Sequence, residues 1–290
     1  MTFVLIILNF LFNLLKRQSR ELNRNLRDTS DPFQLTEDLF QKLYRLNREV
    51  AFELFRELEP FMEVTRRNTR IPKVVKFTTA LHFFAHGSYQ KPVGKDYHCS
   101  LSQASVSRCL NEIMGIINEH LIHRYIRFPT TLQDITRVKN GFYEKFDFPG
   151  VLGCIDCTHI AITPPPANDL VNPAHVFMNR KGFYSINCQI ICDADLKILA
   201  INARYPGSVH DSAIWMLSNI KSVLSRNYFQ NNDHGTWLLG DSGYPLQPFL
   251  LTPIIGANGN TPEGRYTRRH SKKFCGTLHR RFKRIFSMLT

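Results

Sequence analysis

Hydrophobic and polar residues follow two different periods along this chain. Between residues 21 and 65, apolar side chains recur every three or four positions, the spacing that places them on one face of an α-helix. They are Phe40, Leu43, Leu46, Val50, Leu54, Leu58 and Phe61. A basic stretch with a proline, residues 66–76, predicts a loop, and residues 77–86 predict a buried helix that ends at Gly87. The first part of the chain is therefore expected to be α-helical.

A further helix is predicted from Ser102, whose hydroxyl can cap its first turn. Apolar residues then recur at helical spacing, at Val106, Leu110, Ile113, Ile117 and Leu121. The opposite face carries Gln103, Ser105 and Arg108 near the N-terminus, where a recognition helix would contact DNA. This arrangement predicts a helix-turn-helix unit. An ordinary amphipathic helix with a polar first turn is the alternative, and Pro92 with Gly94 interrupts the segment before it.

The pattern changes to short strands from Val151 onward. Strands are predicted over residues 151–162, 184–192 and 198–203, a helix over 211–224, and a strand over 237–239. Three antiparallel strands, then a helical crossover to a parallel strand, is the order of a ribonuclease H-like α/β core. In that order the first and fourth strands are neighbours, so Asp156 and Asp241 are expected to meet at one edge.

The charge balance favours a polyanionic partner. The 37 Lys and Arg residues outnumber the 24 Asp and Glu residues, which gives a net charge of +13. Such an excess attracts nucleic acid, although a basic surface without a specific ligand would have the same composition. DNA is therefore the first partner to consider.

The cysteines do not form the pattern of a disulfide-stabilised secreted domain, because the 7 residues are odd in number and irregularly spaced. A zinc site is one alternative, with Cys154 and Cys157 as one pair and Cys188 and Cys192 as the other. Cys154 and Cys157, however, lie three apart in a predicted strand and would point to opposite faces. A reducing compartment without zinc is the expectation.

Residues 3–15 are almost wholly apolar but are interrupted by Asn9 and Asn13. The run is shorter than the roughly 20 residues that a membrane-spanning helix needs. It also lacks a basic segment before it and a cleavage site after it, so a signal peptide is poorly supported. We expect a short hydrophobic helix that packs on the protein, and no stable membrane span.

Three aspartates carry the candidate chemistry. Asp156 is flanked by apolar residues that make an isolated carboxylate costly, while Asp211 and Asp241 lie at the boundaries of predicted elements. Clustered carboxylates suit Mg²⁺ or Mn²⁺, and such ions promote phosphodiester cleavage. Alternatively, Asp211 could be only a helix cap and Asp156 one half of a buried ion pair.

An ordered series of short sequence motifs supports the first interpretation. The series consists of GCIDCTHIAI (153–162), NRKG (179–182), PGS with an aspartate (206–211), GDSGY (240–244), and RY with HS (265–271). In this order they resemble the motifs of PIF/Harbinger transposases and their domesticated nuclease relatives. The similarity runs from about Phe77 to the end of the chain and includes SQASVSR (102–108).

The resemblance implies roles for individual residues. Asp156 and Asp241 match the first two members of the DDE catalytic triad, and Asp211 matches a further acidic position of the metal site. Arg180 and Lys181 match a basic segment suited to phosphates, although a solvated loop is the alternative. The family also implies DNA binding through the helical region, location in the nucleus with the cytoplasm as an alternative, a homo-oligomer, and a Myb-like DNA-binding partner.

The chain departs from the family pattern where the third triad member is expected. After His270 the family continues with a basic helix that carries a glutamate, whereas here residues 273–276 lead directly into a different basic segment. Glu263 is the last acidic residue of the chain, and its neighbours Pro262 and Gly264 predict a loop. We therefore expect weak cleavage or none.

Together these patterns predict an α/β protein with a ribonuclease H-like nuclease core preceded by an α-helical region. The expected parts are a hydrophobic segment (1–20), a helical region with a helix-turn-helix (21–148) and a DDE-type nuclease domain (149–290). Metal-dependent DNA cleavage is the leading function. A DNA-binding protein with an inactive relic nuclease domain is its main rival, and a small hydrolase acting on nucleotides is a more distant one.

Overall fold

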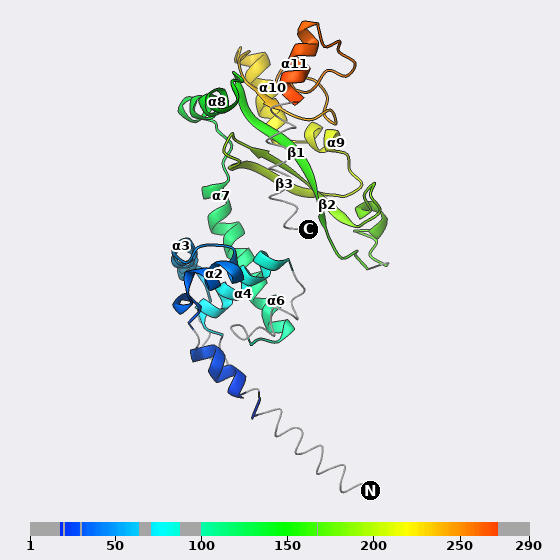
Figure 1. Ribbon diagram of the computed structural model, residues 1–290. Coiled ribbons are helices and arrows are strands. Elements are labelled where there is room, and N and C mark those ends of the chain that lie inside the picture. Colours follow the sequence, from blue (N-terminus) through cyan, green and yellow to red (C-terminus); the bar gives the residue numbers. More distant parts are fainter. Residues whose placement is uncertain are drawn as a thin grey trace. The chain divides into compact units, whose positions relative to one another are not determined.

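The computed structural model describes residues 18–19, 21–29, 31–63, 71–87, 100–166 and 168–271 (Figure 1). Contacts divide the chain into a helical unit, Met1–Arg124, and a sheet unit, Tyr125–Thr290. The helical region expected over 21–148 extends beyond the first unit because helix α8 (Leu132–Phe146) packs on strand β1 of the second. The hydrophobic segment 3–15 lies outside the described residues.

The helical unit is built from short helices around one apolar core. They are η1 (Pro32–Gln34), α2 (Glu37–Tyr44), α3 (Arg48–Leu58), η2 (Glu59–Phe61), α4 (Lys73–His86) and α6 (Gln103–Ile116). Phe40 and Leu58 are fully buried in this core, as the helical spacing predicted. Val50 and Phe61 were expected on the same face but are each 47% exposed. The reason is that several separate helices, rather than one continuous face, cover the core.

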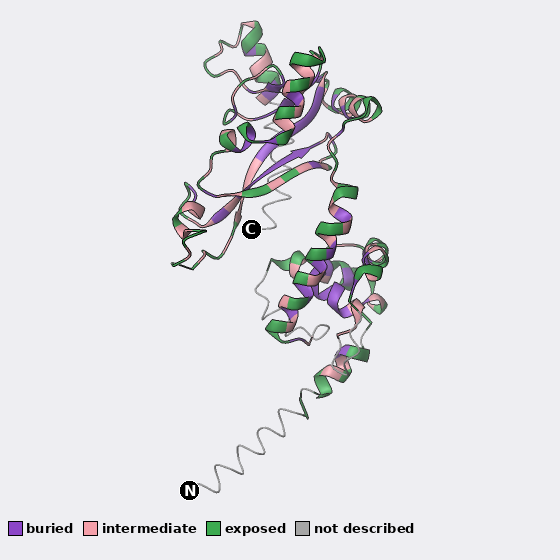
Figure 2. Ribbon diagram, turned by 180° about the vertical axis from the view of Figure 1, so that it is seen from behind, coloured by how far each residue is buried: buried purple, intermediate pink, exposed green. Residues whose placement is uncertain are grey.

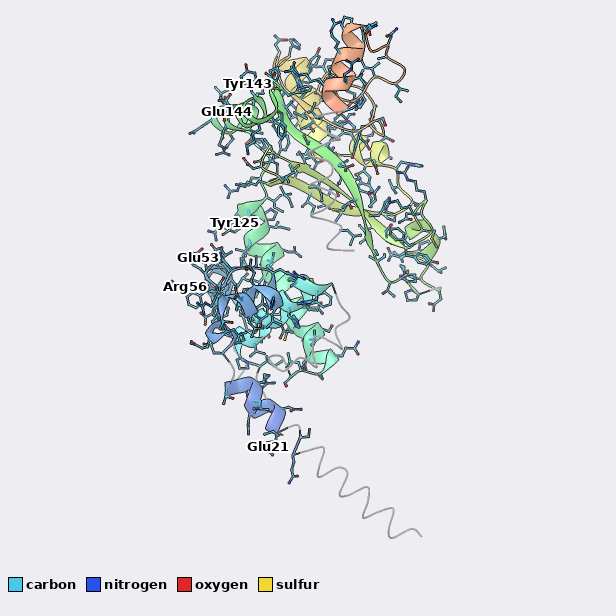
Figure 3. The ribbon with its side chains drawn as sticks, in the orientation of Figure 1. Glu21, Glu53, Arg56, Tyr125, Tyr143 and Glu144 are labelled. Carbon is cyan, nitrogen blue, oxygen red and sulfur yellow. The ribbon has the colours of Figure 1, made fainter. Side chains whose placement is uncertain are left out.

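Helix α3 shows the expected division of an amphipathic helix. Its inner face buries Ala51 and Phe55, while Glu53 and Arg56 lie exposed on the outer face (Figure 3). Asn47 caps the helix by accepting a hydrogen bond from the Val50 amide at 2.8 Å. Local capping and burial therefore both favour a helix over these residues.

Helix α4 begins at Lys73, so the loop predicted over residues 66–76 is wrong for its last four residues. Lys76 is buried in the first turns because its ammonium nitrogen lies 2.7 Å from Glu112 Oε2 on α6. A buried lysine is tolerated only with such a partner. The predicted end of the helix is confirmed, since Gly87 follows it with a left-handed φ of 56°.

Helix α6 begins as predicted after Ser102, whose hydroxyl accepts a hydrogen bond from the Ser105 amide at 3.3 Å. Val106, Leu110 and Ile113 are buried, and α6 packs against α4. The helix continues into a π-helical segment (Ile117–Leu121) and then into α7 (Ile122–Tyr125).

The sheet unit contains five strands in the order β3-β2-β1-β4-β5. The strands are β1 (Val151–Ala161), β2 (Ser185–Cys192), β3 (Ile198–Pro206), β4 (Trp237–Leu239) and β5 (Leu250–Leu251). β1 is antiparallel to β2, β2 is antiparallel to β3, and β4 returns parallel to β1. The predicted ribonuclease H-like order is therefore confirmed.

The crossover from β3 to β4 differs from the prediction in one respect. The single helix expected over residues 211–224 is two helices, α9 (Asp211–Met216) and α10 (Asn219–Gln230). Ser218 separates them because its hydroxyl caps α10 by accepting from the Ile220 amide at 3.2 Å. The unit also contains η4 (Ala174–Phe177) and α11 (Pro262–His270).

The core of the sheet unit surrounds the central strands, which are mostly buried (Figure 2). Ile155, Ile190 and Leu238 are fully buried on adjacent strands, and Phe142 of α8 and Trp215 of α9 are buried against them. This packing fixes the positions of the β1 and β4 backbones. Among the described helices, none is long and apolar enough to cross a membrane.

Candidate functional site

The adjacent strands β1 and β4 bring two of the predicted acidic residues to neighbouring positions in the sheet. Cys154 of β1 pairs with Leu239 of β4 in parallel register. Asp156 and Asp241 each lie two residues beyond this pair. Asp156 is inside β1, whereas Asp241 follows the end of β4 in the turn that leads to β5.

A cavity of about 280 Å³ opens at this end of β4. Asp211 and Asp241 both line it, together with Arg180, His159 and Asn187. The remainder of its wall comes from residues 207–210, Ser212, Ser242 and Gly243. Acidic, basic and hydroxyl groups therefore face one shared space, and we call it the aspartate cavity.

Asp211 is the first residue of α9 and is held by a side chain of the sheet. The Asn187 amide nitrogen donates to Asp211 Oδ1 at 2.8 Å and to the Val209 carbonyl oxygen at 2.8 Å. His210 is the residue that caps α9, without a side-chain cap hydrogen bond. The position of Asp211 is therefore set by Asn187.

Asp241 is held by the turn that follows it. Its Oδ1 accepts a hydrogen bond from the Gly243 amide at 2.9 Å. A side chain at Gly240 would approach the Tyr244 ring to 3.1 Å and Ile155 to 3.3 Å, so this turn is tightly packed against β1. The GDSGY motif thus holds a carboxylate that lines the cavity.

Asp156 does not line the aspartate cavity. It is 5% exposed, and its Oδ1 accepts a hydrogen bond from the Cys157 amide at 2.9 Å. The sulfur of the next residue, Cys157, lies 3.2 Å from the Tyr244 hydroxyl. Burial is the main cause that raises the pKa of this thiol, and the Asp211 carboxylate raises it further. Because neighbouring residues of a strand point to opposite faces, the side chains of Asp156 and Cys157 leave β1 on opposite faces of the sheet.

The structure therefore brings Asp211 and Asp241 to one cavity, and the lining of this cavity does not include Asp156. Within the described part of the chain, no group of three or more His, Cys, Asp or Glu side chains is placed to hold one metal ion. The sequence motifs could not show this, because they do not reveal which face of β1 meets α9.

His159 and the basic residues form the other side of the cavity. His159 Nδ1 lies 3.0 Å from the Ser185 hydroxyl. Burial lowers the pKa of His159, Lys181 and Arg180 lower it further, and Asp211 opposes them. Both predicted basic residues thus lie near His159, although only Arg180 lines the cavity. His159 was not predicted as a site residue, but its spacing of two from Cys157 indicated a shared face.

Gly207 allows the loop before α9 to pass close to β2. Its amide donates to the Ser185 carbonyl oxygen at 2.8 Å, and an added Cβ would lie 2.2 Å from Ser185 Oγ and 2.6 Å from the Phe177 carbonyl oxygen. Only glycine fits here without moving the backbone. The close approach holds the loop that ends at Asp211.

The predicted DNA-contacting residues of α6 lie in the helical unit. Gln103 and Arg108 are exposed at the first turns of the helix. The Arg108 guanidinium donates to the Ser105 hydroxyl at 3.2 Å and to the Ala104 carbonyl oxygen at 3.4 Å, so it lies along its own helix. These side chains are accessible, as a DNA-contacting surface requires.

Glu263 is placed differently from the prediction. It lies in the first turn of α11, where Thr261 caps the helix and Pro262 occupies the first position. The predicted loop at this position is therefore wrong, because proline is favourable at a helix start and Gly264 permits close contact with residue 258. The basic segment after Ser271 lies outside the described residues.

Comparisons with known proteins agree with this architecture. The profile of the family described as "DDE superfamily endonuclease" matches residues 155–290. The fold and this match define a nuclease domain of the transposase type. Over 248 residues the chain is 34% identical to "Putative nuclease HARBI1" of Rattus norvegicus and 33% identical to that of Homo sapiens. Each alignment covers 84% of this chain and 67% of the relative, so the chain belongs to the family of Harbinger transposase-derived nucleases.

Two more distant matches complete the comparison. "Protein ALP1-like" of Arabidopsis thaliana is 26% identical over 207 residues, which cover 68% of this chain and 48% of that protein. A crystal structure of the Mos1 mariner paired end complex with Mn is 14% identical and covers 87% of this chain and 75% of that chain, with a TM-score of 0.19.

Proposed function

We propose that this protein is a metal-dependent DNA endonuclease derived from a Harbinger-type transposase and that it acts in the nucleus. The observation that carries the proposal is the aspartate cavity, where Asp211 and Asp241 face Arg180 beside the end of β4. Phosphodiester cleavage requires carboxylates that hold metal ions and cations that hold phosphate. Both kinds of group line this one space.

The donor set of the cavity fits Mg²⁺ or Mn²⁺. These ions prefer oxygen ligands, and Mg²⁺ is commonly held by one or two carboxylates together with substrate phosphates and water. Asp211 and Asp241 would hold the ion, which supplies a water of lowered pKa and neutralises the leaving oxygen. Asp156 lies outside the lining, so the fit depends on the other two residues.

The chain's own side chains would orient the DNA around this ion. Arg180 at the cavity wall, with Lys181 beside it in sequence, is suited to binding the phosphate next to the scissile bond. Asn187 holds the Asp211 carboxylate, which otherwise would rotate freely at the start of α9. The helical unit, through Gln103, Ser105 and Arg108, would bind the duplex. Self-association and a Myb-like DNA-binding partner belong to the same proposal.

A DNA-binding protein with an inactive nuclease domain is the second candidate. Two observations favour it: residues 273–276 depart from the family pattern where a glutamate is expected, and Glu263 itself lies exposed in α11. Loss of one electrostatic group in such a site typically lowers the rate about a hundredfold to a thousandfold. Under this candidate the chain binds DNA but hardly cleaves it.

A plasmid-nicking assay with Mn²⁺ separates the two candidates. It compares the chain with a version that carries a family-like glutamate segment between Lys273 and Phe274, each with and without Asp241→Asn. We expect weak nicking by the chain, strong nicking by the extended version, and loss of nicking with Asp241→Asn. DNA binding without nicking by either version would support the relic. If the chain without the added segment nicks robustly and Asp156→Ala abolishes this nicking, the aspartates suffice for cleavage.

A further inference from the structure

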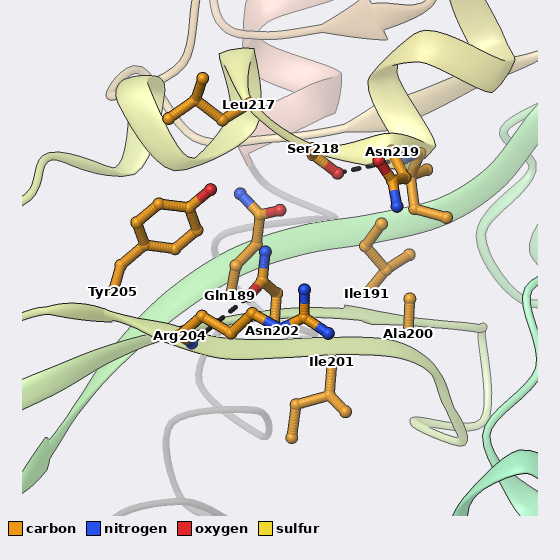
Figure 4. A pocket seen from close by; sticks show the side chains of 11 residues that line it. Gln189, Ile191, Ala200, Ile201, Asn202, Arg204, Tyr205, Leu217, Ser218 and Asn219 are labelled. Atoms are coloured by element: carbon orange, nitrogen blue, oxygen red, sulfur yellow. Dashed lines mark hydrogen bonds between the residues drawn. The ribbon is translucent and has the colours of Figure 1, made fainter.

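A second cavity on the sheet is lined by residues other than those of the aspartate cavity. Its volume is about 270 Å³, and it is formed by β2 and β3 on one side and by the junction of α9 and α10 on the other (Figure 4). The polar side chains that line it include Gln189, Asn202, Arg204, Tyr205 and Ser218. We call it the amide cavity, because two side-chain amides form its floor.

Gln189 is the most informative residue of this cavity. It is 3% exposed, and its side-chain amide nitrogen has no hydrogen-bond partner among the described residues. A buried donor left in this state costs about 1–3 kcal/mol. A ligand that carries a hydrogen-bond acceptor would remove this cost, so the position favours a polar ligand over an empty cavity.

An irregularity in β3 turns a further side chain into the same cavity. Gln189 pairs with Asn202, whereas Asn187 pairs with Tyr205, so β3 has one more residue than β2 between these pairs. In a regular strand Asn202 and Tyr205, three residues apart, would point to opposite faces. The bulge places both on the face of Gln189, and bulges commonly redirect side chains in this way.

The groups of the amide cavity match the parts of a nucleotide. The amides of Gln189 and Asn202 can recognise the edge of a base, and the Tyr205 ring can stack on its face. The Asn202 amide is fixed in place because its oxygen accepts from the Arg204 backbone nitrogen at 3.3 Å (Figure 4). Arg204 is exposed at the rim, where a phosphate would lie. Neutral amides at the buried end disfavour an anion there.

We propose that the amide cavity binds the base of an unpaired deoxynucleotide, with Gln189 and Asn202 on its edge, Tyr205 on its face and Arg204 on its phosphate. This inference rests on the proposed function only in that the ligand is DNA. The amide cavity lies on the edge strand β3. It adjoins the aspartate cavity, because Gln189 of the first and Asn187 of the second are two residues apart on β2. A strand end held here would be positioned near the site of cleavage.

The test measures binding of two labelled single-stranded probes by fluorescence anisotropy. One is a short oligodeoxyadenylate, and the other has the same backbone length but abasic residues. We expect about tenfold tighter binding of the first probe, the effect of stacking and pairing one base. Gln189→Leu should remove this preference and leave binding of the abasic probe unchanged. Gln230→Leu, the same change at an exposed position of α10, should leave the preference intact.

Stability measurements show whether the variant simply fails to fold. Gln189→Leu removes an unpartnered buried donor, so its melting temperature should be equal to or above that of the parent chain. Tyr205→Phe should keep the preference and Tyr205→Leu should weaken it, because the ring rather than the hydroxyl stacks on the base. Equal binding of both probes by the parent chain, or an unchanged preference in Gln189→Leu, would overturn the proposal.

The same experiment separates this inference from the proposed cleavage. Asp241→Asn should abolish any nicking without changing the preference for bases, because Asp241 does not line the amide cavity. A base preference in a chain that never cleaves would support the amide cavity alone. Cleavage without a base preference would support the aspartate cavity alone.

Discussion

The side-chain amide of Asn187 and the carboxylate of Asp211 are joined by a hydrogen bond of 2.8 Å between Nδ2 and Oδ1. The same nitrogen donates to the Val209 carbonyl oxygen at 2.8 Å, so one residue of β2 holds both the loop before α9 and its first carboxylate. Asn187 is 1% exposed. A buried residue thus sets the position of a functional group at the surface of the cavity.

Replacing Asn187 with leucine should weaken divalent-metal binding. Asp211 would lose its donor and the Val209 carbonyl would lose its partner, which should cost about 1–3 kcal/mol of stability. Calorimetric titration with Mn²⁺ and thermal denaturation measure the two effects. Asn231→Leu, at the exposed end of α10, is the matched control. If Mn²⁺ affinity is the same in both variants, Asn187 does not position a ligand of the ion.

Gly207→Ala should destabilise the protein by about 1–3 kcal/mol, since an added methyl group overlaps Ser185 Oγ at 2.2 Å and packed regions tolerate such additions poorly. Gly235→Ala provides the control, because nothing lies within 4 Å of an added Cβ there. Urea denaturation of the two variants measures the difference. Equal midpoints would mean that the loop before α9 can move away from β2 at little cost.

The stability of the sheet unit should fall in mild acid because of His270. This residue is fully buried in α11, its Nε2–H donates to the Leu251 carbonyl oxygen at 3.2 Å, and burial lowers its pKa to about 4. In the unfolded chain His270 takes up a proton near pH 6.5. Its contribution to the free energy of unfolding is therefore complete above that pH and is lost as the pH falls to about 4. Over this range the free energy of unfolding should fall by about 3 kcal/mol.

The measurement is the free energy of unfolding between pH 7 and pH 4, compared between the parent chain and His270→Gln. The variant should show a flatter pH dependence because it cannot take up this proton on unfolding. His175→Gln, at an exposed position, should follow the parent curve. Identical slopes for the parent chain and His270→Gln would contradict the assignment.

DNA binding should depend steeply on salt, because the net charge of +13 implies phosphate contacts that release counterions. Arg108→Ala should weaken binding to all sequences and reduce the salt slope by about one. Gln103→Ala should instead change sequence preference if α6 lies in the major groove. Binding isotherms at several salt concentrations measure both effects. Two variants that bind as the parent does would assign α6 to packing alone.

The sequence by itself determined the main helices and strands and their order. Helical and strand periods, the Ser102 cap and the glycine at position 87 are local signals, because a few neighbouring residues set the backbone dihedrals and satisfy the first hydrogen bonds. The succession of strands and crossover helix then permitted few sheet orders, which is why β1 and β4 could be expected side by side. The ordered motifs predicted the family from the same linear information.

Only the tertiary structure decided which side chains share a space. Asp156 and Cys157 are neighbours in sequence, yet the pleat sends them to opposite faces, and the packing of α9 selects the Cys157 face. The bulge that turns Tyr205 toward Gln189 arises from pairing between two strands and leaves no local signal. Both outcomes depend on contacts between distant segments, which form only when the sheet buries its core and fixes the register of every strand.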